Sequence, residues 1–110
     1  MKLKKYIILC LITSLTGGLS AQKTMTGIEV LKKDNFKILE RKRGGLITNP
    51  TGVDNSLKST IDILFEAPNV NLVALYGPEH GVRGDVHAGD KVENSTDPST
   101  GLPVYSLYGK

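Results

Sequence analysis

Residues 72–85 read LVALYGPEHGVRGD, an apolar run that stops at Gly77-Pro78 and is followed at once by charged side chains between glycines. A nearly continuous apolar run bounded by turn residues is typical of a parallel strand that is covered on both faces. Glu79, His80 and Arg83 come directly after this run. In open α/β sheets, ligands bind beyond the carboxyl ends of the strands. We therefore expect this loop to form the edge of a functional site.

A second strand and a helix are predicted before this run. Residues 46–48, Leu-Ile-Thr, form a short β-rich segment that should end by Asn49, because Pro50 cannot donate a hydrogen bond to a sheet. A helical pattern follows, with Ser56 or Ser59 as the N-terminal cap. The apolar face of this helix is predicted to consist of Leu57, Ile61, Leu64 and Phe65. Strand, helix and strand together predict a right-handed βαβ unit.

The remaining segments fit the same α/β class. Residues 28–39 have the spacing of one or two short helices, and residues 102–108 offer a third short strand. Between the apolar run that ends at Tyr76 and this third strand, residues 77–101 are rich in Gly, Asp, Asn, Ser and Thr and read as a loop. A structureless loop of that length is uncommon in a compact domain unless it is functional. Because the chain ends at Lys110, directly after the third strand, we expect it to be the front of a larger α/β protein.

The first 21 residues have the order of a secretory signal peptide. Lys2, Lys4 and Lys5 precede an apolar run from Tyr6 to Leu15, and small residues lead to a cleavage position after Ala21. The apolar run is shorter than the roughly 20 residues that a bilayer core requires, which argues against a stable membrane anchor. Lipoprotein processing at Cys10 is also disfavoured, because this cysteine lies within the apolar run and follows a bulky leucine. We expect residues 22–110 to be the mature part, located in the periplasm or secreted.

Charge and cysteine content narrow the function classes. The chain has 14 Lys and Arg against 11 Asp and Glu, but three of the lysines belong to the leader, so the mature part has no net charge. A nucleic-acid partner therefore has little support, and the basic cluster between Lys32 and Arg43 is better explained as a solvated helix face. Cleavage would also remove Cys10, the only cysteine, and with it any disulfide or thiol chemistry.

Glu79 is the strongest candidate for acid or base chemistry. A carboxyl beside an imidazole at a sheet edge can have its pKa moved by burial and by its neighbour, and His80 could orient it or bind substrate. Asn49 and Thr51 follow the preceding strand, so they are expected to point into the same crevice and bind hydroxyls or an amide of a ligand. An ordinary capped turn at residues 49–54 and a polar turn at Glu79-His80 are the structural alternatives.

Three segments resemble the opening of the bacterial exo-β-N-acetylmuramidase family, long described as a domain of unknown function. These segments are residues 44–54 (GGLITNPTGVD), 76–84 (YGPEHGVRG) and 100–109 (TGLPVYSLYG). They occur in order across nearly the whole mature chain. The resemblance implies the N-terminal part of a Rossmann-like parallel-sheet domain, within a two-domain protein whose active site lies between the domains.

The resemblance also implies an activity and a set of site residues. The family removes terminal β-1,4-linked N-acetylmuramic acid from the non-reducing ends of peptidoglycan fragments. Glu79 and His80 match the family's Gly-Pro-Glu-His-Gly motif, which makes Glu79 the expected catalytic carboxyl with His80 beside it. Asn49 and Arg83 match other motif positions as substrate contacts, and Arg83 could bind the lactyl carboxylate of muramic acid with two parallel hydrogen bonds. No cofactor is implied.

Some alternatives stay open from the sequence. Glycoside hydrolysis normally needs two carboxyl groups, and the second could be Asp85, Asp90 or Glu93 or lie outside this chain; Asp85 is also a candidate for binding substrate. A non-catalytic glycan-binding module of the cell envelope is one competing function. A metal-dependent hydrolase is another, with His80, Asp85, His87 and Asp90 as ligands, although their spacing matches no known zinc motif. For the 110 residues alone we expect little or no activity.

Overall fold

The computed structural model describes residue 3 and residues 23–91 and 93–108. Apart from Leu3, the predicted signal peptide at residues 1–21 lies outside the described residues. Within the described part of the chain, no helix is both long enough and apolar enough to span a bilayer.

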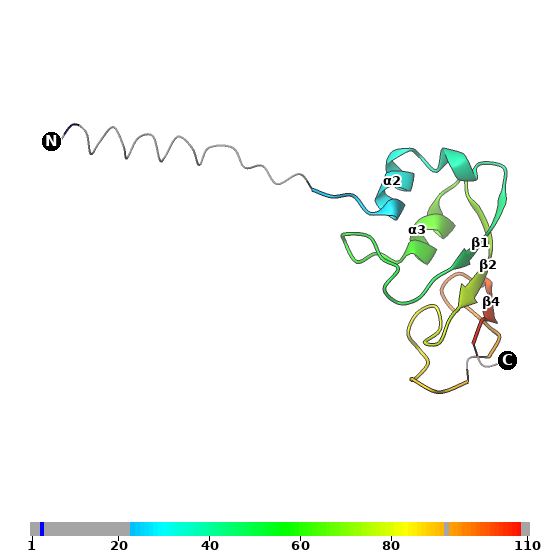
Figure 1. Cartoon of the computed structure of the whole chain (residues 1–110). Helices are drawn as coiled ribbons and strands as arrows, with labels where there is room; N and C mark the ends of the chain where they lie inside the picture. Colours follow the sequence, from blue (N-terminus) through cyan, green and yellow to red (C-terminus); the bar gives the residue numbers. More distant parts are fainter. Residues whose placement is uncertain (1–2, 4–22, 92, 109–110) are drawn as a thin grey trace.

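The described chain is a mixed α/β structure built on a four-stranded sheet (Figure 1). The strands are β1 (Arg43–Ile47), β2 (Asn71–Gly77), β3 (Ser95–Thr96) and β4 (Pro103–Ser106), and their order in the sheet is β1-β2-β4-β3. β2 pairs in parallel with both β1 and β4, whereas β3 pairs antiparallel with β4. The three predicted strands and their α/β arrangement are confirmed. The short strand β3 was not predicted, because two residues are too few to show a periodic pattern.

β2 forms the centre of the parallel part, as its apolar sequence predicts. Leu75 pairs with Leu46 on one side and with Val104 on the other, and it is 0% exposed. A parallel strand that is covered on both faces needs apolar side chains at nearly every position. The run from Leu72 to Tyr76 supplies them. In the described chain, however, helices cover only one face of β2, and Val73 and Tyr76 are partly buried.

The helix between β1 and β2 is shorter than predicted. α3 (Thr60–Glu66) begins after Ser59, whose hydroxyl accepts a hydrogen bond from the N–H of Ile61 at 3.2 Å. Leu57 lies before the helix, with φ of 62° and 81% of its surface exposed, so its predicted place on the apolar face is wrong. The reason is a turn at Asp54, whose carboxylate accepts the N–H groups of Ser56 and Lys58. The residues that α3 buries are Ile61, Ile63 and Leu64, while Phe65 is 45% exposed.

The N-terminal part forms two short helical pieces, as predicted. α2 (Gly27–Lys33) starts with a capping box, in which the N–H of Thr26 donates to Glu29 Oε2 at 2.8 Å. After it the chain turns through two residues with positive φ, Asn35 and Phe36, into η1 (Lys37–Leu39). Phe36 is 8% exposed and anchors this turn in the core.

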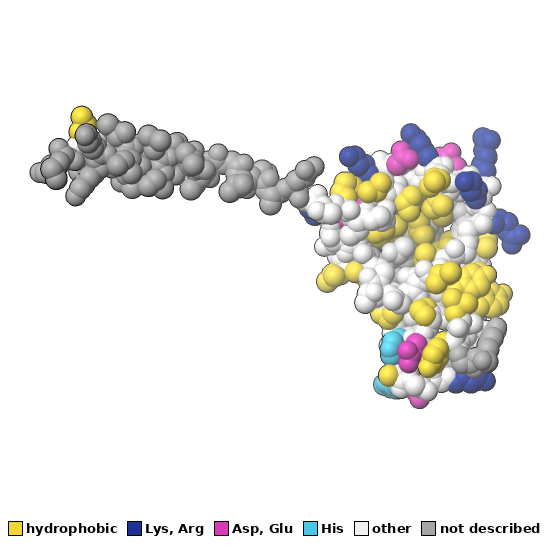
Figure 2. Space-filling view, in the orientation of Figure 1, with side chains coloured by type: hydrophobic (Ala, Val, Ile, Leu, Met, Phe, Trp, Pro, Cys, Tyr) yellow, Lys and Arg dark blue, Asp and Glu magenta, His cyan; other side chains and the backbone are white. Residues whose placement is uncertain are grey.

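The two faces of the sheet differ in their cover. α2 and α3 lie on one side, where the core cluster includes Ile61, Leu75 and Val104 (Figure 1). On the other face, the rings of Tyr76 and Tyr105 stack with centroids 5.5 Å apart. Ile47, which is in register with Tyr76, is 69% exposed. Figure 2 shows apolar side chains gathered over the strands in this region. The predicted uncovered sheet face is therefore present in the chain by itself.

Candidate functional site

The loops after β1 and β2 lie side by side at one edge of the sheet. The strands stay paired up to this edge, because the N–H of Thr48 donates to the carbonyl of Tyr76 at 3.1 Å. The two loops enclose a pocket of about 450 Å³. Its lining, called the Glu79 pocket from here on, consists of Asn49, Pro50, Thr51, Pro78, Glu79, His80, Gly84 and Val86. Four of the predicted site residues, Asn49, Thr51, Glu79 and His80, thus come together in the structure.

Asn49 and Thr51 form the wall contributed by the β1 side. Asn49 Oδ1 accepts hydrogen bonds from the backbone N–H of Thr51 at 3.1 Å and from its hydroxyl at 2.8 Å. This turn uses the acceptor of Asn49 and the hydroxyl proton of Thr51. Within the described part of the chain, no hydrogen bond uses the amide NH₂ of Asn49 or the lone pairs of Thr51 Oγ1, so the wall presents a donor beside an acceptor to a ligand.

Glu79 and His80 come from the loop after β2, residues 78–86, which we call the Glu79 loop. Glu79 is partly buried and His80 is exposed. His80 Nδ1 lies 3.4 Å from the carbonyl oxygen of Val86, a contact that joins the two ends of this loop. Among the described residues no hydrogen bond connects His80 with Glu79. The structure therefore places the pair in one pocket but does not show His80 orienting the carboxyl.

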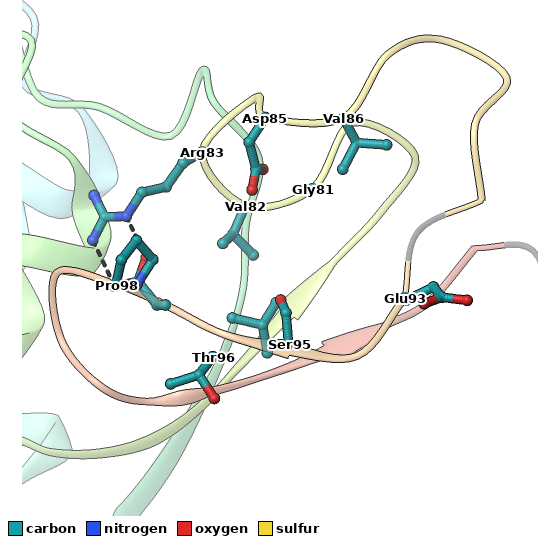
Figure 3. A pocket seen from close by; sticks show the side chains of 11 residues that line it. Gly81, Val82, Arg83, Asp85, Val86, Glu93, Ser95, Thr96 and Pro98 are labelled. Carbon is teal, nitrogen blue, oxygen red and sulfur yellow. Dashed lines mark hydrogen bonds and ion pairs between the residues drawn. The ribbon is translucent and has the colours of Figure 1, made fainter.

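Arg83 does not face the Glu79 pocket, and its predicted role as a carboxylate clamp is not supported. Its guanidinium donates to Asp97 from Nε at 2.5 Å and from Nη2 at 2.9 Å. It also donates to Asp62 from Nη2 at 2.8 Å and from Nη1 at 3.3 Å. Both edges that could bind a carboxylate with parallel hydrogen bonds are thus occupied by side chains of the protein. Figure 3 shows Arg83 extending toward the segment that contains Pro98.

The hydrogen bonds of this network shift the pKa values of Asp97 and Arg83. Hydrogen bonds from Arg83, followed by those from Thr100, hold the pKa of Asp97 below its ordinary value of 3.8, although burial opposes the shift. The same contacts with Asp97 and Asp62 raise the pKa of Arg83. Asp97 is 2% exposed, so its charge is compensated within the protein and not by water.

We expect the network to contribute less stability in acid. Because the folded-state pKa of Asp97 lies below 3.8, its stabilising effect is complete above that pH and is lost as the pH falls through the lower folded-state value. Asp97→Asn should therefore lower the free energy of unfolding by about 1–3 kcal/mol near neutral pH and by clearly less at about pH 3. Urea unfolding of both proteins at the two pH values measures this. A loss of the same size at both would show that the charge of Asp97 is not what stabilises the turn.

Asp85 is also outside the Glu79 pocket. It is exposed and lines a smaller hollow of about 150 Å³, together with Arg83 and Val82 (Figure 3). The structure therefore does not bring Asp85 together with Glu79 in one pocket, and its contact with substrate stays a prediction. Of the other candidates for a second carboxyl, Glu93 lines this hollow and Asp90 is exposed. Within the described residues, Glu79 is the one carboxyl that lines the Glu79 pocket.

The described residues also bear on the metal alternative. No three side chains of His, Cys, Asp or Glu among them gather in a way that could hold a metal ion. His80, Asp85, His87 and Asp90 are each exposed and do not converge. The alternative of a zinc or manganese site at these four residues has no support from this geometry.

Gly84 joins the two loops of the pocket and is a position where a side chain should be poorly tolerated. Its φ is 80°, and a β-carbon there would lie 2.9 Å from Pro50 Cγ. Gly84→Ala should therefore destabilise the fold by about 1–3 kcal/mol and move the loops apart. Gly89→Ala is a matched control, since Gly89 has φ of 85° but nothing within 4 Å of an added β-carbon. Equal losses in urea unfolding would show that contact with Pro50 is unimportant.

Comparison with known proteins shows the family of this chain. The model for the N-terminal part of the exo-β-N-acetylmuramidase NamZ matches residues 45–110, a range that includes Asn49, Thr51, Glu79 and His80. The chain belongs to this family. Its resemblance to the exo-β-N-acetylmuramidases, stated from three sequence motifs, is thereby confirmed.

Two proteins similar to this chain are several times longer than the matched segment. The peptidoglycan β-N-acetylmuramidase NamZ of Bacillus subtilis (strain 168) is 61% identical over 88 residues, which are 80% of this chain and 21% of that protein. A crystal structure of a DUF1343 family protein from Bacteroides fragilis is 78% identical, with a TM-score of 0.70. It covers 78% of this chain, and the match spans 21% of that structure. The chain therefore spans about a fifth of the length of the relatives it matches.

Proposed function

We propose that this chain is the N-terminal part of a peptidoglycan glycoside hydrolase that releases N-acetylmuramic acid from the non-reducing ends of glycan fragments. The observation that carries the proposal is the Glu79 pocket, in which the ends of two parallel strands bring a carboxyl, an imidazole, an amide and a hydroxyl together. Membership of the NamZ family and 61% identity to a peptidoglycan β-N-acetylmuramidase support it.

In this proposal Glu79 exchanges a proton with the oxygen that bridges two sugars. A general acid must lie within hydrogen-bond reach of the atom that it protonates, and a carboxyl on the pocket wall can meet this condition. The amide NH₂ of Asn49 and the hydroxyl of Thr51 would bind polar groups of the sugar, and His80 would contact the substrate from the same loop as Glu79. No metal or organic cofactor takes part.

The second carboxyl of the reaction is proposed to come from beyond residue 110. Glycosidases use two carboxyl groups on either side of the scissile bond, and the described part of the pocket contributes Glu79 alone. This division also gives a reason why the 110-residue chain by itself should have little or no activity.

Further proposals concern the rest of the full-length protein. We propose that the mainly parallel sheet is part of a Rossmann-like domain, and that further elements of the full-length protein cover the face around Tyr76 and Tyr105. Residues 1–21 would serve as a signal peptide, so that the enzyme meets its glycan in the periplasm or outside the cell.

The proposal is tested by a hydrolysis assay. The enzyme is a full-length protein, as long as the relatives, that contains this sequence. The substrate is a disaccharide with N-acetylmuramic acid at its non-reducing end, and the product is identified by mass spectrometry. We expect free N-acetylmuramic acid from the full-length protein, unaffected by a chelator, and none from residues 22–110 alone. A folded full-length protein that binds the disaccharide without cleaving it would instead indicate a glycan-binding module. This module is the second candidate, because the described part of the pocket contains a single carboxyl. Activity lost to a chelator and restored by zinc or manganese would indicate a metal-dependent hydrolase.

A further inference from the structure

We propose that Arg83 is a positioning residue, which fixes the Glu79 loop by joining it to two carboxylates from other parts of the fold. The proposal concerns the same pocket and rests on the proposed function for its kinetic test. It replaces the role of substrate clamp that the sequence indicated for this arginine.

Arg83 connects three segments that are distant in the sequence. Asp62 belongs to α3, Asp97 follows β3, and Arg83 itself lies in the Glu79 loop. Four hydrogen bonds leave the guanidinium, which has five N–H donors in total. A planar group that is held on two edges can neither rotate nor translate without breaking several bonds at once. Arg83 is therefore suited to hold the loop in one position.

The principal partner of Arg83 is itself fixed. Asp97 Oδ2 accepts hydrogen bonds from the backbone N–H of Thr100 at 3.0 Å and from its hydroxyl at 2.7 Å. The N–H of Gly101 also donates to the carbonyl of Asp97 at 2.8 Å. These contacts close a turn directly before β4. The carboxylate that binds Arg83 is therefore held in place by the segment that leads into the sheet.

The neighbours of Arg83 carry this restraint to the pocket. Val82 is 6% exposed and belongs to the core cluster, so it fixes the loop to the core beside Arg83. Gly84 packs against Pro50 of the facing loop. The N–H of Gly81 donates to the carbonyl of Pro78, which closes the turn that contains Glu79 and His80. Residues 82–84 are thus anchored at three points. Loss of the Arg83 anchor should displace the turn that carries the catalytic carboxyl.

The experiment uses the full-length protein with Arg83→Lys and Arg83→Met. Lysine keeps the positive charge but lacks the planar fork, so both variants should lose the anchor. We expect kcat to fall by roughly 10- to 100-fold, as for a small misplacement of a reacting group, while KM changes by less than about threefold. Lys32→Met is the matched control, because Lys32 forms an ion pair with buried Asp54 at 3.0 Å without touching the Glu79 loop. This variant should keep the kcat of the parent.

A modified substrate separates positioning from carboxylate recognition. The parent and the Arg83 variants are compared on the disaccharide and on its analogue with the lactyl carboxylate converted to an amide. If Arg83 positions the loop, the ratio of kcat/KM for the two substrates stays the same in parent and variants. A variant that loses the preference for the carboxylate, or whose KM rises while kcat is unchanged, would overturn the proposal.

Hydrogen exchange tests the same proposal without relying on activity. In Arg83→Met, the amides of residues 78–86 should exchange faster than in the parent, whereas those of β1 and β2 should keep their protection. Unchanged protection of residues 78–86 would overturn the positioning role even in an active enzyme. Faster exchange in a protein that cleaves no glycan would support the positioning role and count against the proposed function alone.

Discussion

Glu79→Gln in the full-length protein is expected to lower kcat for release of N-acetylmuramic acid by roughly 10²- to 10⁴-fold. The amide has nearly the shape of the carboxyl but cannot donate or accept the proton that the bridging oxygen requires. Glu79 is partly buried on the pocket wall, and no other carboxyl of the described residues lines that pocket. Within the described residues, no other carboxyl can therefore take its place. Initial rates over a range of disaccharide concentrations measure the effect.

The controls for this prediction are folding and an equivalent change elsewhere. Glu66→Gln makes the same substitution at an exposed carboxyl on α3, outside the pocket, and should leave kcat within about twofold. The circular dichroism spectrum of Glu79→Gln should match that of the parent. If a well-folded Glu79→Gln variant keeps more than about a tenth of the parent rate, Glu79 is not the proton donor.

Leu75→Ala is expected to give the largest loss of stability, about 2–5 kcal/mol. Leu75 is 0% exposed in the central strand and belongs to the same core cluster as Ile61 and Val104. Removing its branched end loses the transfer free energy of the buried atoms and leaves a cavity that rigid neighbours cannot fill. β2 also ends at the Glu79 loop, so disorder in this strand should lower activity as well. Urea unfolding followed by circular dichroism gives the change in free energy.

Leu57→Ala is the matched control, because it deletes the same atoms from a leucine that is 81% exposed. Alanine keeps the β-carbon, so the backbone strain at φ of 62° is the same in both proteins. The free energy of unfolding should change by no more than about 0.5 kcal/mol. Similar losses for the two variants would mean that β2 is not the centre of the core.

The sequence predicted those parts of the fold whose signals are local. The apolar run of β2 and the turn at Gly77-Pro78 specify a buried strand and its end without reference to other segments. Asn49 and Glu79 could be expected to meet, because consecutive parallel strands end at the same edge of a sheet. The Glu79 pocket follows from these two facts.

The parts that were not predicted depend on partners distant in the sequence. The sequence around an arginine does not show whether its guanidinium binds a ligand or other side chains of the protein. The carboxylates that Arg83 binds, Asp62 and Asp97, are 21 and 14 residues away. Leu57 fits a helical period, but the hydrogen bonds that Asp54 accepts from the next residues form a turn instead. In both cases an aspartate decides the outcome, through contacts that spacing alone does not reveal.

A crystal structure of full-length Glu79→Gln with the intact disaccharide bound is the most direct test of the account. The central claim is that β2 delivers residue 79 to the pocket shared with Asn49, where it meets the bridging oxygen of the substrate. The account predicts the side-chain amide of residue 79 within about 3.2 Å of that oxygen, with Asn49 Nδ2 in contact with the terminal sugar. A disaccharide bound elsewhere, or with its bridging oxygen beyond the reach of residue 79, would contradict it.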